Sequence, residues 1–86
     1  MNEQANELSQ VLESLSYLQK DLMIPRNIRN KIKNAHSALL EEDKTLPLRI
    51  DKSIQELDEI AEDPNVPIDT KTQLWNIFSK LECIQQ

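Results

Sequence analysis

The stretch DLMIPRNIRNKI (21–32) returns 42 residues later as DPNVPIDTKTQL (63–74), and this recurrence decides the fold. In both copies an aspartate is followed four residues later by a proline and eleven residues later by a large aliphatic residue. Proline suits the first position of a helix, because its missing N–H would have no partner there, and it disfavours helical geometry in the residue before it. Each copy is therefore predicted to hold a turn between two helices.

Apolar residues recur at spacings of three, four and seven on both sides of these turns, as expected for one buried face on a helix. The stripes predict four helices, at about 3–22, 25–43, 47–62 and 67–85. No segment shows the period-two alternation of a half-buried strand, so no strands are predicted. The apolar positions are Leu8, Val11, Leu12, Leu15, Leu18 and Leu22; Ile28, Ile32, Ala35 and Leu39; Ile50, Ile54, Leu57, Ile60 and Ala61; and Leu74, Ile77, Phe78, Leu81 and Ile84.

The period of 42 residues extends beyond the two turns. It places the apolar stripe of the first predicted helix on that of the third, and the stripe of the second on that of the fourth. Two helical hairpins are too few for a solenoid, and short connections force neighbouring helices to run antiparallel. We predict a single all-α domain, 1–86, folded as an up-and-down antiparallel four-helix bundle built from two similar helical hairpins.

The composition narrows the possible functions. The 86 residues include no glycine, one cysteine and one histidine, and 10 basic against 15 acidic residues give a net charge of −5. Phosphate-binding loops, the dinucleotide fingerprint and the nucleophile elbow all need glycine, because a Cβ would obstruct the backbone there. One cysteine and one histidine cannot form a cysteine-rich zinc site, a two-histidine site or an internal disulfide. We therefore expect no enzymatic activity, no cofactor, no metal and no small-molecule substrate.

The sequence also bears on location. No apolar run approaches the roughly 20 residues that a membrane span needs. The first 20 residues lack the basic and apolar blocks of a signal peptide. We expect a soluble, cytoplasmic protein without a membrane partner.

Four basic residues open the second predicted helix: Arg26, Arg29, Lys31 and Lys33. Cations are unfavourable there because they oppose the helix dipole. One interpretation is a phosphate-binding face for RNA or the ribosome. The other is neutralisation within the bundle, since the acidic run 56–63 closes the third helix at the same end. That acidic run lacks the spacing of a calcium loop, so we interpret it as a solvated or ion-pairing face.

The fourth predicted helix has a wider apolar arc than the second. Three of its apolar residues correspond, under the 42-residue shift, to polar ones: Trp75 to Lys33, Phe78 to His36 and Ile84 to Glu42. A wider arc either fills a deeper core or leaves a patch for a partner, and tryptophan is enriched at binding hot spots. The leading hypothesis is a non-enzymatic interaction or scaffold module that binds another protein or itself through Trp75, Phe78 and Ile84. The alternative is an RNA- or ribosome-associated factor that uses the four basic residues.

Two segments, IPRNIRNKI (24–32) and LDEIAEDPNVPIDTKTQLWNI (57–77), resemble a family of small archaeal proteins of unknown function. The likeness is strongest at DPNVP (63–67) and at Trp75-Asn76. It implies a compact bundle of four helices in an up-and-down arrangement, an archaeal source and a cytoplasmic setting. It implies no activity and no functional residues.

Overall fold

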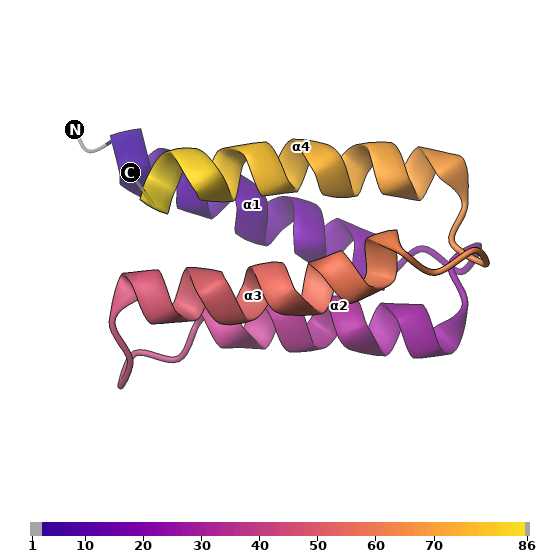
Figure 1. Cartoon of the computed structure of the whole chain (residues 1–86), viewed down its shortest axis with the longest axis horizontal. Helices are drawn as coiled ribbons and strands as arrows, with labels where there is room; N and C mark the ends of the chain where they lie inside the picture. The colour runs from indigo at the N-terminus through magenta and orange to yellow at the C-terminus, as the bar shows by residue number, and fades with distance from the viewer. Residues whose placement is uncertain (1–2, 86) are drawn as a thin grey trace.

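The computed structural model describes residues 3–85, which form four helices: α1 (Glu3–Gln19), α2 (Arg26–Leu39), α3 (Leu46–Ala61) and α4 (Ile68–Gln85). Each helix runs antiparallel to the next along the chain (Figure 1). The described residues contain no strand. The all-α fold of four helices is thus confirmed. Residues 1–2 and 86, which the predicted domain 1–86 includes, lie outside the described residues.

Each helix packs against two others, so the bundle has a square arrangement. α1 contacts α2 and α4, while α3 contacts the same two helices from the other side. Within the described residues, the diagonal pairs do not approach each other. The turns after α1 and α3 lie together at one end of the bundle, and the turn after α2 lies at the other end (Figure 1). The core fills the space between the four helices.

The 42-residue period of the sequence is also a period of burial. Eight buried positions of the first half fall on buried positions of the second: Val11 on Ser53, Leu15 on Leu57, Leu18 on Ile60, Ile24 on Val66, Ile28 on Thr70, Ile32 on Leu74, Ala35 on Ile77 and Leu39 on Leu81. The two hairpins therefore contribute equivalent faces to one core, and each half acts as an internal control for the other.

The turns after α1 and α3 share one hydrogen-bond pattern. The N–H of Met23 donates to Oδ1 of Asp21 at 2.9 Å, and the N–H of Asn65 donates to Oδ1 of Asp63 at 2.8 Å. An aspartate that bonds the backbone two residues ahead forms an Asx turn, which reverses the chain in place of a glycine turn. No described residue has a positive φ. This pattern explains how a chain without glycine makes such short connections.

The first helix is shorter than predicted. α1 ends at Gln19 rather than at residue 22, because the N–H groups of Lys20 and Asp21 donate to the carbonyls three residues before them. The predicted core position Leu22 is wrong for the same reason: the turn carries this side chain outward and leaves it 82% exposed.

The second helix is also shorter than predicted. It ends at Leu39 rather than at residue 43, since the N–H groups of Leu40 and Glu41 donate to the carbonyls of Ser37 and Ala38. These bonds tighten the last helical turn and begin the connection to α3. Residues 40–43 therefore belong to the turn and not to α2.

Ser53 is the one polar member of the buried pairs that has no hydrogen-bond partner among the described residues. Its equivalent in the first half is Val11, which is fully buried as well. A buried hydroxyl without a partner loses its hydration with no compensation, at a cost of about 1–3 kcal/mol.

We expect Ser53→Ala to raise the free energy of unfolding by about 1 kcal/mol, because it removes this hydroxyl and alanine is the better helix former. Urea denaturation measures the change. The matched control, Val11→Ser, is expected to lower the free energy of unfolding. A stabilising Val11→Ser, or a destabilising Ser53→Ala, would contradict the account.

Candidate functional site

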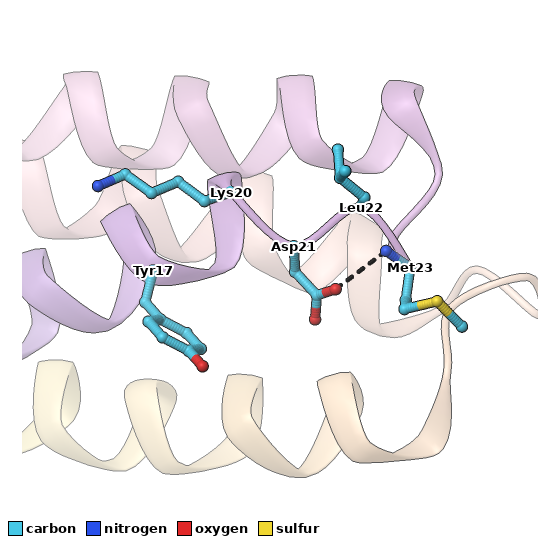
Figure 2. Close-up of a pocket in the computed structure, with 5 residues that line it drawn as sticks. All are labelled: Tyr17, Lys20, Asp21, Leu22 and Met23. Atoms are coloured by element: carbon cyan, nitrogen blue, oxygen red, sulfur yellow. Dashed lines mark hydrogen bonds between the residues drawn. The ribbon is translucent and has the colours of Figure 1, made fainter.

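An open recess of about 500 Å³ lies where α1 passes into its turn, lined by Tyr17, Lys20, Asp21, Leu22 and Met23. We call it the turn-1 recess (Figure 2). Its apolar side chains are strongly exposed, Tyr17 by 72% and Met23 by 83%. The carboxylate of Asp21 is committed to the N–H of Met23, as the dashed line in Figure 2 shows. The recess therefore offers a contact surface of apolar side chains beside a single lysine.

The apolar side chains that line the turn-1 recess are not repeated in the other hairpin. The equivalent positions there carry residues of different character: Glu59 for Tyr17, Pro64 for Leu22 and Asn65 for Met23. Because both turns have the same Asx hydrogen bond, that bond does not require the apolar side chains. Sequence reasoning missed this surface, since it assigned Leu22 to the core. The contrast between Leu22-Met23 and Pro64-Asn65 was the signal that could have found it.

A second hollow, the α3–α4 groove, has a volume of about 420 Å³ and is lined by Ile54, Asp58, Ala61, Trp75, Phe78, Ser79 and Glu82. Trp75 is 55% exposed, and Phe78 is partly buried against the core. The structure thus brings two of the three predicted contact residues, Trp75 and Phe78, into one groove.

Ile84, the third predicted contact residue, lies in the core and is only 3% exposed. It continues the buried stripe of α4 at a spacing of three residues from Leu81, which keeps it on the inward face. Ile84 is therefore not part of a contact surface in this structure. The sequence comparison misjudged it because the equivalent residue, Glu42, lies beyond the end of α2 and is not helical at all.

The four basic residues at the start of α2 have different surroundings. Nε of Arg29 donates to the carbonyl of Ile24 at 3.1 Å, so this guanidinium caps the preceding turn. Arg49 does the same after the turn between α2 and α3, where its Nε donates to the carbonyl of Lys44 at 2.9 Å. The recurrence indicates that an arginine five residues after the last turn residue stabilises the turn.

The other three basic residues lie on the surface of α2. Nζ of Lys31 lies 3.4 Å from Oε2 of Glu59 on α3, at a solvent-exposed position. Arg26 and Lys33 are exposed and pair with no acidic side chain of the described residues. Of these three cations, only Lys31 thus pairs with an acidic residue of α3, while Arg26 and Lys33 face solvent.

We expect Arg29→Gln to lower the free energy of unfolding by about 1 kcal/mol, since it removes the charged donor that holds the turn. Lys33→Gln also removes one positive charge, from an exposed position of the same helix. It is expected to alter the free energy of unfolding by less than about 0.5 kcal/mol. Thermal and urea unfolding of the two variants check this. Equal effects of the two substitutions would remove the structural role assigned to Arg29.

The acidic run 56–63 forms no common centre. Glu56 lies 3.6 Å from Nζ of Lys52 in an ion pair along α3, and the carboxylate of Asp63 holds its turn. Across the described residues, no three His, Cys, Asp or Glu side chains are placed to hold a metal ion.

At the opposite end of the bundle, the hydrogen bond and charge of Glu41, with a smaller effect of Asp43, raise the pKa of Lys44 above its usual value. None of the described helices is long and apolar enough to cross a membrane.

These features define a class of protein: a small up-and-down bundle of two equivalent helical hairpins with apolar side chains exposed outside the core. The chain belongs to the uncharacterised protein family UPF0147, whose sequence model matches residues 1–84. This confirms the resemblance noted in the sequence.

Relatives and solved structures agree with this assignment. A UPF0147 protein of Methanosarcina acetivorans is 39% identical over 83 residues, which cover 96% of this chain and 86% of that relative. The crystal structure of MMP1188, a protein of unknown function, has a TM-score of 0.90 at 44% identity and covers 95% of this chain and 93% of its own. A UPF0147 protein of Thermoplasma acidophilum has a TM-score of 0.89 at 36% identity, covering 93% of this chain and 94% of its own.

Proposed function

We propose that the chain is a small non-enzymatic interaction module that binds another protein through apolar side chains outside its core. One observation carries this proposal: exposed apolar residues stand where the other hairpin, with the same backbone, has polar ones. Trp75 corresponds to Lys33, and Met23 corresponds to Asn65. The repeated turn and helix pattern therefore does not dictate apolar side chains at these positions, and exposed apolar patches are typical of binding surfaces.

The size of the exposed residues supports a protein as the partner. A tryptophan that is half exposed offers a large area for burial, and apolar burial contributes about 25 cal/mol for each Å² removed from water. Tryptophan and tyrosine are among the residues that dominate the binding free energy of protein interfaces. We expect the module to act in the cytoplasm of an archaeal cell and to carry out no catalysis.

RNA binding is the second candidate, and the exposed Arg26 and Lys33 support it. Three features favour the first candidate. Arg29 is committed to its turn, the net charge is −5, and the chain has only three aromatic residues on which bases could stack.

Affinity capture with the tagged chain distinguishes the two candidates. A lysate of the source cells is divided, and one half is treated with nuclease before capture. The proposal predicts one protein at a fixed stoichiometry in both halves. Capture of ribosomal proteins from the untreated half alone would contradict it and would assign the function to the basic residues of α2. Two substitutions then show whether the turn-1 recess or the α3–α4 groove holds the partner. They are Met23→Asn and Trp75→Lys, and each introduces the residue found at the equivalent position of the other hairpin.

A further inference from the structure

The α3–α4 groove combines an exposed indole with an acidic rim. Trp75 and Phe78 come from α4, while the two carboxylates are Asp58 on α3 and Glu82 on α4. Both acidic residues are exposed, and neither carboxylate is engaged by a cationic side chain of the described residues. No lysine, arginine or histidine lines the groove. The groove is thus apolar at its base and negative at its edge.

The other hairpin shows that this character is not imposed by the fold. The equivalent helical positions of α1 and α2 carry different residues: Ser16 for Asp58, Lys33 for Trp75 and His36 for Phe78. Leu40, the residue equivalent to Glu82, lies just beyond the end of α2. At the three helical positions the first hairpin therefore carries no carboxylate and no indole. The indole and the two carboxylates occur together on one face of the bundle only.

We propose that the α3–α4 groove binds an arginine or lysine side chain presented on an apolar segment of a partner protein. This rests on the proposed function and adds the chemistry of the partner. A cation is attracted to the face of an indole, and arginine stacks on aromatic rings more readily than lysine does. Carboxylates beside the ring pair with the same cation. Ile54 and Ala61 offer an apolar base for the methylene groups of the partner's side chain.

The chain carries a built-in reporter for this groove. Trp75 is the single tryptophan of the sequence, so indole fluorescence reports on the α3–α4 groove alone. The probes are four acetylated, amidated twelve-residue helical peptides of alanine and leucine that differ in three positions, filled by arginine, lysine, glutamine or glutamate. Titration of the full chain with each peptide gives a Kd from the emission of Trp75.

We expect the arginine peptide to bind at least tenfold more tightly than the glutamine peptide, with the lysine peptide between them and no saturable binding of the glutamate peptide. The double variant Asp58→Asn/Glu82→Gln keeps the reporter, and it is expected to weaken the arginine peptide at least tenfold. Glu42→Gln/Asp43→Asn removes the same charge from the turn between α2 and α3, and it is expected to leave the Kd within twofold.

Equal affinities of the arginine and glutamine peptides would overturn the inference, as would a double variant that binds like the unaltered chain. Trp75→Lys lacks the fluorescent reporter, so its peptide binding is measured by isothermal titration calorimetry. Peptide binding that is independent of charge but lost in Trp75→Lys would overturn the preference for cations and leave the interaction module intact. Sedimentation of the chain alone tests a second copy as the occupant. A dimer that Asp58→Asn/Glu82→Gln abolishes would also overturn the inference.

Discussion

Leu57→Ala is expected to lower the free energy of unfolding by about 3 kcal/mol. Leu57 is fully buried among aliphatic side chains, so truncation removes its apolar contacts and leaves a cavity that the packed helices fill only in part. Leu15 occupies the equivalent position in the first hairpin and is buried to the same degree. Leu15→Ala is therefore expected to cost as much as Leu57→Ala, within about 1 kcal/mol.

Urea denaturation followed by circular dichroism measures both costs. The control is Leu48→Ala, since Leu48 is a leucine of α3 that is largely exposed, and its truncation is expected to change the free energy of unfolding by less than about 0.5 kcal/mol. Two separate unfolding transitions, or a cost at one leucine that is less than half the cost at the other, would mean that the hairpins do not share one core.

Trp75→Lys is expected to weaken binding to the captured protein by at least ~30-fold, about 2 kcal/mol, as is typical of a tryptophan hot spot. The free energy of unfolding is expected to fall by less than about 1 kcal/mol, because Trp75 is half exposed and a lysine occupies the same place in the other hairpin. Isothermal titration with the purified partner gives the affinity, and urea denaturation gives the stability.

Lys33→Gln serves as the matched control for this substitution, since Lys33 stands at the equivalent position of α2. It is expected to leave both quantities unchanged. A Trp75→Lys variant that loses more than about 2 kcal/mol of stability while it keeps its affinity would place Trp75 in the core and remove it from the interface.

Most of the fold could be predicted from the sequence because the same physical signals occur twice. Pro25 and Pro67 mark two turns, and apolar residues at helical spacing mark the faces that meet in the core. The ends of the helices could not be predicted as well. Periodicity does not show where the last hydrogen bond of a helix forms, and the Asx turn at Asp21 ends α1 before the apolar stripe does. This is why Leu22 was assigned to the core and lies on the surface.

The candidate sites were harder to predict, since they depend on which face a side chain occupies at the end of an element. The 42-residue shift marks Ile84 as a surplus apolar residue because its equivalent, Glu42, is polar. α2 ends before Glu42, whereas α4 continues past Ile84, so the two residues are not in comparable places. Trp75 could be compared with Lys33 because both positions are helical in the structure.

The basic residues of α2 show a further limit of the sequence. Charge alone does not distinguish an arginine that binds phosphate from one that caps a turn. The distance from Nε of Arg29 to the carbonyl of Ile24 makes that distinction, and the bond of Arg49 repeats it at the next turn. The shared spacing of these two arginines from their turns is visible in the sequence only after the turns have been located.

Size-exclusion chromatography of a nuclease-treated lysate, with the unaltered chain and Trp75→Lys detected side by side, tests whether Trp75 holds the chain in a complex with another protein. We expect the unaltered chain to elute in a complex well above its own mass of 10.0 kDa, and Trp75→Lys to elute with a larger free fraction. If both chains elute free after nuclease treatment, and the complex is present only in untreated lysate, nucleic acid holds the assembly together and the interaction module is contradicted.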